Sequence, residues 1–317
     1  MKKALLIFLV AATVGAGVTP AQAEAASKKK KAVAAKAQRV SVQITARHKV
    51  RVQSARRVAS FDDARHLALQ SSAALVLDQA TGAILFEKNP NAVLPIASIT
   101  KLMTAMVVLD AKPDLNETLT ISQEDVDMLK GTRSRLRVGT QLAREEMLRL
   151  ALMSSENRAA SALSRHYPDG REAFVAAMNR KAQALGLVDT RFQDATGLTA
   201  ANVSSPRDLA KMVDAAHHYP LIREFSTTSE GEFSIAGRAQ QFRNTNTLVK
   251  SPTWEIGLSK TGYINEAGKC LVMQAWLNNK PIIIVLLDSW GRLTRIGDAN
   301  RIKRWVESAS LVRASAG

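Results

Sequence analysis

The stretch Pro95-Ile96-Ala97-Ser98-Ile99-Thr100-Lys101-Leu102-Met103-Thr104-Ala105 decides how the rest of this chain is interpreted. Residues 99–109 contain neither glycine nor proline and predict a helix, with Ser98 where an N-cap or first-turn residue would stand. Ser98 and Lys101 are three positions apart, which on a helix brings their side chains to one face. A helix start also favours a developing anion. The pair suits a serine nucleophile and a lysine base, although this spacing is common by chance.

A lysine is a poor base at its ordinary pKa of about 10.4. Burial or a second cation lowers that pKa, and a neutral Lys101 could then accept the Ser98 proton. Lys260, in the triplet Lys260-Thr261-Gly262, is a candidate for that second cation. On a strand Lys260 and Thr261 point to opposite faces, and Gly262 allows a close approach of the backbone. The alternative is a surface lysine at a strand end.

A third segment, Ser155-Glu156-Asn157, offers a hydroxyl that can relay a proton and a carboxamide that can hold a substrate amide. Serine and asparagine also favour helix caps, so this triplet alone is not decisive. In this order, however, S-x-x-K, S-x-N and K-T-G make up the signature of serine acyl-transfer enzymes that react with penicillins. We therefore expect Ser98, Lys101 and Ser155 to be catalytic.

The order of apolar segments predicts an α+β fold. Two short runs, 73–78 and 83–87, surround a Thr81-Gly82 turn and predict a hairpin. Residues 110–220 are largely helical in pattern, and 224–246 indicate an irregular hairpin. Three apolar runs follow, and a last helix is expected over 294–308 with Ile296, Ile302, Trp305 and Val306 facing inward. Both chain ends then supply one antiparallel sheet, and helices lie between them.

The N-terminal sequence predicts export. Lys2 and Lys3 precede an apolar stretch that is short for a membrane span, and Ala21-Gln22-Ala23 is typical of a cleavage site, so 1–23 is interpreted as a signal peptide. The net charge is +16, and residues 24–66 hold twelve lysines and arginines against three acidic residues. This leader is expected to be disordered and to meet anionic envelope polymers rather than nucleic acid, or to be only a solvated tail. The expected boundaries are 67–310 for the catalytic domain and 311–317 for a tail.

Other candidate sites are weaker. Cys270, the only cysteine, lies in an apolar run and is expected to be a buried hydrophobe rather than a reactive thiol. The five histidines show no zinc spacing, so no metal and no cofactor are expected. No later run is long and apolar enough to predict a transmembrane anchor after signal cleavage.

The three motifs in their local contexts resemble the low-molecular-weight penicillin-binding serine DD-peptidases. The resemblance covers roughly 67–310 and includes segments beyond the triplets. These segments are Pro95–Ala105, Phe192–Leu198 with Asn202, Asn244–Asn246, Leu258–Tyr263 and Ala267–Leu271. The fold that it implies, an antiparallel sheet flanked by helices with a helical subdomain, agrees with the order of elements above.

The resemblance also implies roles for particular residues. Ser98 would form the acyl-enzyme, Lys101 would be the general base, and Ser155 would shuttle protons. Asn157 would orient the substrate amide, and Lys260 and Thr261 would contact acidic groups of the substrate. Gly262 would sit beside the substrate, and the backbone N–H groups of Ser98 and Tyr263 would form the oxyanion hole. The substrates would be peptidoglycan peptides, with β-lactam antibiotics as inhibitors.

Two details favour the D-alanyl-D-alanine endopeptidase branch, which cuts peptidoglycan cross-links in the periplasm. Ser259 stands before Lys260, and after Gly262 the sequence continues only to Gly317, which leaves room for two strands and one helix. A D-alanyl-D-alanine carboxypeptidase that trims pentapeptides remains an alternative, as does a non-catalytic penicillin-binding or wall-binding protein. A class A β-lactamase is disfavoured because Glu156 replaces the usual aspartate and no E-x-x-L-N segment follows.

Overall fold

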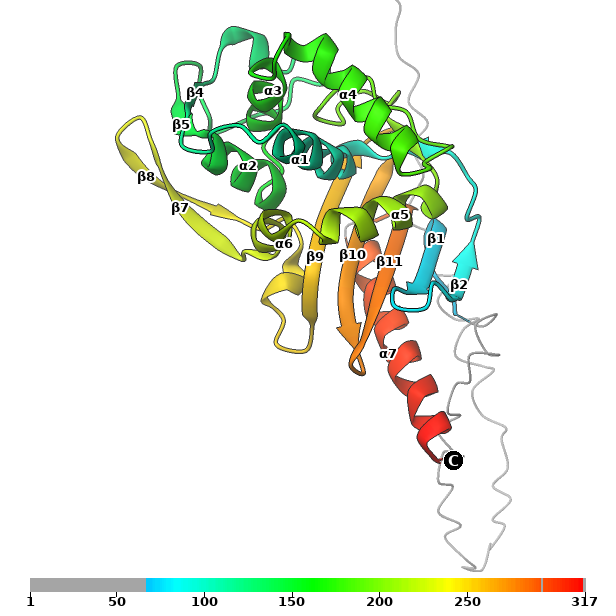
Figure 1. The fold of residues 1–317 in the computed structure, drawn as a ribbon. Helices are drawn as coiled ribbons and strands as arrows, with labels where there is room; N and C mark the ends of the chain where they lie inside the picture. Colours follow the sequence, from blue (N-terminus) through cyan, green and yellow to red (C-terminus); the bar gives the residue numbers. More distant parts are fainter. Residues whose placement is uncertain (1–66, 292, 316–317) are drawn as a thin grey trace, which may run out of the picture. The chain divides into compact units, whose positions relative to one another are not determined.

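The computed structural model describes residues 67–291 and 293–315, and its centre is a five-stranded antiparallel sheet. Its strands are β1 (Ser71–Asp78), β2 (Ile84–Lys88), β9 (Glu255–Ile264), β10 (Gly268–Leu277) and β11 (Lys280–Ser289). They lie in the order β2-β1-β11-β10-β9, so strands from the two ends of the chain are neighbours (Figure 1). The predicted hairpin, the three later strands and the α+β class are confirmed.

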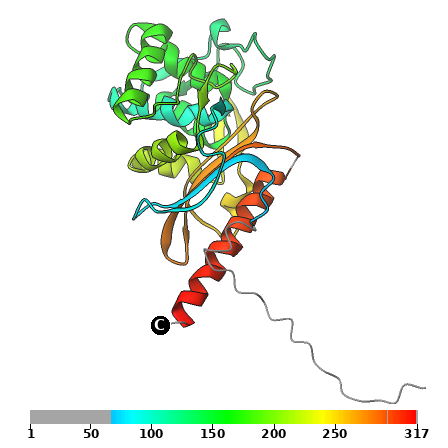
Figure 2. The ribbon, with the colours of Figure 1, turned by 90° about the vertical axis from the view of Figure 1, so that its right-hand side faces the viewer.

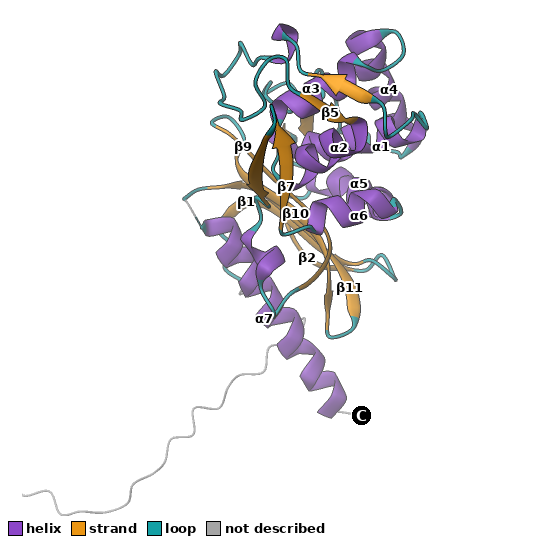
Figure 3. Cartoon of the chain, turned by 90° about the vertical axis from the view of Figure 1, so that its left-hand side faces the viewer, coloured by secondary structure: helices purple, strands orange, loops and turns teal. Residues whose placement is uncertain are grey.

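Each face of the sheet is covered by helices. The helix α7 (Thr294–Ser315) packs on one face through Ile302, Trp305 and Val306, which are buried, and Ile296 packs at the edge of this cluster. The other helices lie on the opposite face (Figures 2 and 3). The predicted inward face of the last helix is therefore confirmed. The helix continues beyond Ser308 to Ser315 because residues 309–314 contain no glycine or proline to end it.

The helical region between the sheet strands surrounds the helix α1 (Thr100–Asp110), in which every residue from Thr100 to Val108 is buried. A helix with no solvent-facing side belongs in the core. Around it lie α2 (Arg144–Met153), α3 (Asn157–Arg165), α4 (Gly170–Ala184), α5 (Pro206–His217) and α6 (Pro220–Thr227). The helix that carries Lys101 is thus held rigidly inside the molecule.

Short elements interrupt the helical region. Two-stranded pairs form between β3 (Leu94–Pro95) and β6 (Val203–Ser204), between β4 (Thr118–Thr120) and β5 (Gln141–Ala143), and between β7 (Glu230–Ile235) and β8 (Arg238–Arg243). Single 3-10 turns are η3 (Ala97–Ile99), η4 (Gln123–Asp125) and η5 (Thr247–Lys250). The hairpin expected over 224–246 is confirmed from residue 230 onward, whereas its start continues α6.

One buried carboxylate ties the two ends of the described chain together. Asp298 of α7 accepts hydrogen bonds from the backbone N–H of Ser71 at 2.8 Å and from the Ser71 hydroxyl at 2.6 Å. Asp298 also pairs with Arg301, so its charge is compensated. This contact fixes β1 against α7, and it was not predicted from the sequence.

The expected signal peptide and basic leader lie outside the described residues, as does the end of the expected tail. Within the part of the chain that the structure describes, no helix is long and apolar enough to cross a membrane. Cys270 is fully buried in β10, and burial raises the pKa of its thiol to about 11. The expectation that Cys270 belongs to the core is therefore confirmed.

Candidate active site

Ser98 lies in a tight turn that leads into α1. It is the middle residue of η3, and Ile99 occupies the N-cap of α1 without a side-chain capping bond. Of the two expected positions, N-cap or first turn, Ser98 takes the turn: the chain tightens into a 3-10 turn that runs directly into α1, and the hydroxyl stays available. Ala97, just before Ser98, has a φ of 46°, a strained value for a residue with a Cβ.

Two glycines hold this turn in place. A Cβ on Gly262 of β9 would lie 2.8 Å from the Ile96 carbonyl oxygen and 3.1 Å from the Ser98 nitrogen. A Cβ on Gly197 would lie 1.9 Å from the Ala97 carbonyl oxygen. Only glycine fits at either position, so Gly262 brings the β9 backbone against the Ser98 turn. Its close approach is to the protein itself, beside the candidate nucleophile.

Lys101 points from the first turn of α1 toward Ser98. Its ammonium nitrogen Nζ lies 2.9 Å from Ser98 Oγ, 2.7 Å from Asn157 Oδ1 and 2.7 Å from the Thr196 carbonyl oxygen. The residue is 1% exposed. Burial lowers the pKa of Lys101 to about 7, although the negative charges of Asp194 and Glu156 act in the opposite direction. A substantial fraction of this side chain is therefore neutral at neutral pH.

The arrangement directs a neutral Lys101 toward Ser98. A neutral amine has two hydrogens and one lone pair. Asn157 Oδ1 and the Thr196 carbonyl can only accept, so they take the two hydrogens. The lone pair is then left for the hydrogen of the Ser98 hydroxyl. The expected nucleophile and base are thus in hydrogen-bond contact with the proton-transfer polarity that a general base needs.

The Thr196 carbonyl is held by a tight loop. Asp194 accepts hydrogen bonds from the backbone N–H groups of Thr196, at 2.6 Å, and of Thr199, at 3.0 Å. Asn202 donates to the Asp194 carbonyl and to the hydroxyl of Thr100 on α1. This loop therefore fixes the third partner of Lys101, a role that the sequence reasoning did not assign to it.

Ser155 and Lys260 form a second hydroxyl–lysine pair. Lys260 Nζ donates to Ser155 Oγ at 2.9 Å and to the Thr261 carbonyl at 2.9 Å. Ser155 has a φ of 60°, a strained backbone between α2 and α3 that points its hydroxyl toward this lysine. Burial, Lys101 and Arg295 together lower the pKa of Lys260 well below its ordinary value.

Burial is the largest cause of the lowered pKa of both Lys101 and Lys260, and the repulsion between the two lysines adds to it. The physical reason is that both lysines are almost fully buried, so desolvation acts on each before any neighbouring charge does. Lys260 is therefore suited to share protons with Ser155 rather than to serve as a permanent cation.

The remaining predicted residues lie on α3 and β9, the elements that follow Ser155 and carry Lys260. Asn157, the first residue of α3, donates from Nδ2 to Thr132 Oγ1 at 3.1 Å. The Thr261 hydroxyl bonds to that of Thr245, on the strand face opposite to Lys260, as strand alternation predicts. Tyr263 is 54% exposed and donates to Asn265.

Arg295 is a further cation beside this cluster that the sequence did not identify. It donates from Nη1 to the Gly262 carbonyl at 3.0 Å and to the Cys270 carbonyl at 3.2 Å. It lies at the start of the predicted last helix, but only the folded chain brings it to β9. The same holds for Thr132, which no motif indicates, and for Thr196, which lies in the segment Phe192–Leu198 but had no role assigned to it.

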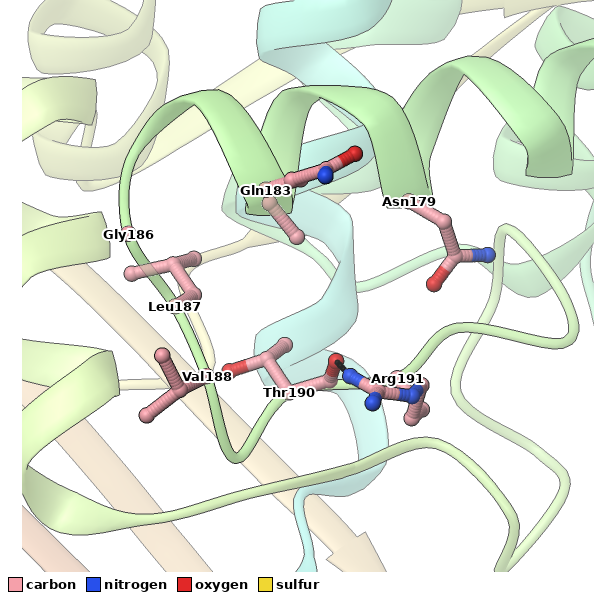
Figure 4. Close-up of a pocket in the computed structure, with 8 residues that line it drawn as sticks. Asn179, Gln183, Gly186, Leu187, Val188, Thr190 and Arg191 are labelled. Atoms are coloured by element: carbon pink, nitrogen blue, oxygen red, sulfur yellow. Dashed lines mark hydrogen bonds between the residues drawn. The ribbon is translucent and has the colours of Figure 1, made fainter.

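A cavity elsewhere in the molecule does not compete with this cluster. It has a volume of about 450 Å³ and lies between α4 and the chain that follows it. Figure 4 shows Asn179 and Gln183 on the helix, and Val188 and Arg191 on the following segment. No acid, histidine, cysteine or lysine lines it. It therefore lacks a nucleophile–base pair.

Fold and site define a serine acyl-transfer enzyme, and comparison with known proteins narrows the class. Residues 59–290 match the peptidase S11 family, described as D-alanyl-D-alanine carboxypeptidase, and the chain belongs to this family. The predicted resemblance to serine DD-peptidases is thereby confirmed.

Individual relatives agree with this assignment. The chain is 51% identical over 245 residues to a D-alanyl-D-alanine endopeptidase of Pseudomonas aeruginosa, covering 77% of this chain and 79% of that one. It is 45% identical over 262 residues to a D-alanyl-D-alanine endopeptidase of Escherichia coli, with coverage of 82% and 84%. The crystal structure of the Streptomyces K15 DD-transpeptidase superposes with a TM-score of 0.70 at 28% identity, covering 75% of this chain and 97% of that one.

Proposed function

We propose that this serine DD-peptidase hydrolyses the D-alanyl bond within peptidoglycan cross-links through an acyl-enzyme on Ser98. The observation that carries the proposal is the contact of Ser98 Oγ with Lys101 Nζ at 2.9 Å, with a lysine pKa of about 7. A serine beside a base that is partly neutral at working pH is what covalent acyl transfer needs. A structural lysine gains nothing from burial without a carboxylate partner.

In the acylation step, Lys101 accepts the Ser98 proton while Ser98 Oγ bonds to the carbonyl carbon of the substrate. The backbone N–H groups of Ser98 and Tyr263 receive the oxyanion, and one such donor is typically worth about 10²–10³ in rate. The C–N bond then breaks, and the leaving amine takes a proton through the Ser155–Lys260 pair. Water hydrolyses the ester and restores the Ser98 hydroxyl.

The substrate is oriented by the groups around this centre. Asn157 Nδ2 presents a donor to the substrate amide, and Lys260, Thr261 and Gly262 form the strand edge along which the substrate lies. Peptidoglycan peptides are the substrates in this proposal, and β-lactams acylate the same serine. Residues 24–66 are proposed to contact anionic envelope polymers. The pattern of residues 1–23 supports export, and the similarity to D-alanyl-D-alanine endopeptidases supports a periplasmic location.

The endopeptidase reaction is preferred because the Pseudomonas and Escherichia relatives, at 51% and 45% identity, are both named D-alanyl-D-alanine endopeptidases. The second candidate is carboxypeptidase activity, because a Bacillus subtilis relative that is 33% identical over 227 residues is named a D-alanyl-D-alanine carboxypeptidase. The two reactions use the same centre and differ in the size of the leaving group.

One digestion separates the two reactions. The mature protein is incubated with purified cross-linked muropeptide dimers and, separately, with pentapeptide monomers, and the products are resolved by chromatography. Cleavage of dimers without loss of D-alanine from monomers is expected. Release of D-alanine from monomers alone would replace the endopeptidase assignment with the carboxypeptidase. Binding of penicillin without turnover of either substrate would support a non-catalytic protein.

A further inference from the structure

A segment without a recognised motif crosses from the helical region to the sheet beside the candidate site. The Asp127 carboxylate organises its first half by accepting hydrogen bonds from the backbone N–H groups of Leu129 and Lys130, each at 2.9 Å. It also accepts from the Thr132 N–H at 2.9 Å and the Thr132 hydroxyl at 2.7 Å. Within this turn, the Lys130 side chain forms an ion pair with Glu266 in the β9–β10 turn. The segment is therefore held by its own Asp127 turn and by an ion pair to the β9–β10 turn.

Glu156, which precedes α3, and the first two residues of α3 bind this same segment. Ser134 Oγ donates to Glu156 at 2.6 Å, Asn157 Nδ2 donates to Thr132 Oγ1 at 3.1 Å, and Arg158 donates to the Leu136 carbonyl at 2.8 Å. Of these three contacts, that of Asn157 connects the segment to the candidate base, because Asn157 Oδ1 also accepts a hydrogen bond from Lys101.

The polarity of the Thr132 hydroxyl is fixed. An ionised carboxylate can only accept, so the hydroxyl hydrogen of Thr132 must go to Asp127. Burial alone would raise the pKa of Asp127, but its hydrogen bonds from Lys130, Thr132 and Leu129 outweigh burial and lower it. Asp127 therefore stays ionised at neutral pH, and Thr132 Oγ1 is left to act only as an acceptor toward Asn157.

This polarity decides which way the Asn157 carboxamide faces. With an acceptor on one side, the NH₂ group must point to Thr132, and Oδ1 must then point to Lys101. In the reversed orientation two oxygens would meet at Thr132 and the NH₂ group would face the amine of Lys101. Lys101 would lose one of the two acceptors that direct its lone pair at Ser98.

We propose that Thr132, oriented by Asp127, is a positioning residue that fixes the Asn157 carboxamide and thereby aims Lys101 at Ser98. The inference rests on the proposed role of Lys101 as base. It assigns to the 127–136 segment a function in acylation that none of the three motifs contains. Asn157 then serves two partners at once, because its orientation toward Lys101 also leaves one N–H for the substrate.

A matched pair of variants tests the proposal. Thr132→Val keeps the shape of the side chain but removes the acceptor, whereas Thr132→Ser keeps the hydroxyl. The second-order rate of acylation by a fluorescent penicillin is measured for both across pH 5 to 9. Thr132→Val is expected to lower the plateau rate about tenfold, since a misplaced catalytic group costs up to about 10²-fold. Thr132→Ser is expected to recover most of the wild-type rate.

The pH profile separates positioning from general damage. The charged groups that face Lys101 are Glu156, Asp194 and Lys260, and both variants leave all three in place. Loss of the Asn157 oxygen as an acceptor disfavours the ammonium form, so the acid limb for Thr132→Val should move to lower pH. A variant that is merely less well folded would lose amplitude with no displacement of the limb, and this result would overturn the proposal.

A double-mutant cycle closes the test. In an Asn157→Ala background, Thr132→Val should have no further effect on the rate, because Thr132 acts only through Asn157. The same fractional loss in both backgrounds would refute the inference. Wild-type protein that is not acylated at all would instead refute the proposed function, so the two failures are distinguishable.

Discussion

The acid limb of the acylation rate should report Lys101 directly. Burial places its pKa at about 7, so Lys101 is neutral in about half of the molecules at pH 7 and in about 1% at pH 5. The acylation rate should therefore fall about 50-fold from pH 7 to pH 5. With an ordinary pKa of about 10.4, only about 1 in 2,500 molecules would hold a neutral lysine at pH 7. Burial therefore contributes about 10³-fold to the available base.

The assay is stopped-flow acylation by a fluorescent penicillin from pH 4.5 to 9, with circular dichroism at each pH to confirm that the protein is folded. Glu156→Gln is the informative variant, because it removes a negative charge that raises the pKa of Lys101 and can still accept from Ser134. Its acid limb should lie at lower pH than that of the wild type. If the acid limb of Glu156→Gln coincides with that of the wild type, or if the wild type shows no limb near pH 7, the claim that burial and nearby charges set the pKa of Lys101 is refuted.

Three further predictions follow from packing and charge. Gly262→Ala should lower acylation about 10²-fold, because its Cβ would lie 2.8 Å from the Ile96 carbonyl and displace the Ser98 turn, while Gly297→Ala on α7 should leave acylation unchanged; equal rates for both variants would contradict the packing argument. Cys270 should resist a thiol reagent at pH 8 in the native protein and react only after unfolding, since its thiol is buried with a pKa of about 11; fast labelling of native protein would show that β10 opens. Asp125→Asn should lower the free energy of unfolding by about 1–3 kcal/mol at pH 7, measured with urea, because Asp125 accepts charged hydrogen bonds from Arg165 and Arg171. Burial alone would raise the pKa of Asp125, but hydrogen bonds from Arg165, the Ser122 backbone and Ser161 lower it overall, so its contribution exists above the unfolded pKa near 4 and is lost as pH falls through the lower folded value; a variant whose deficit persists undiminished at pH 2 would contradict this.

The sheet and its covering helix could be predicted from the sequence because their signals are local. The runs around Thr81-Gly82 and the three runs after Trp254 alternate between apolar segments and turns, and they form the strands β1, β2, β9, β10 and β11. The strands β4 and β5 were missed because each has three residues, too few to show a period. The 3-10 turn at Ser98 was missed because no capping side chain at Ile99 marks where α1 begins.

The candidate site divides in the same way. The contact between Ser98 and Lys101 could be predicted from the sequence because the two residues are three positions apart on one helical segment. The Thr196 carbonyl is 95 positions from Lys101, and its part in the site depends on how the loop around Asp194 folds. The cause of the lowered pKa of Lys101 could not be predicted from the sequence either, because the burial of a side chain depends on how the whole core packs and not on the residues adjacent to it in the chain.

The central claim is that Ser98 is the residue acylated by the substrate. Mass spectrometry of the intact protein after brief incubation with benzylpenicillin, followed by peptide mapping, tests it most directly. One adduct per chain is expected, located on the peptide that contains Ser98 and absent from Ser98→Ala. An adduct on Ser155, or one that persists in Ser98→Ala, would contradict the account.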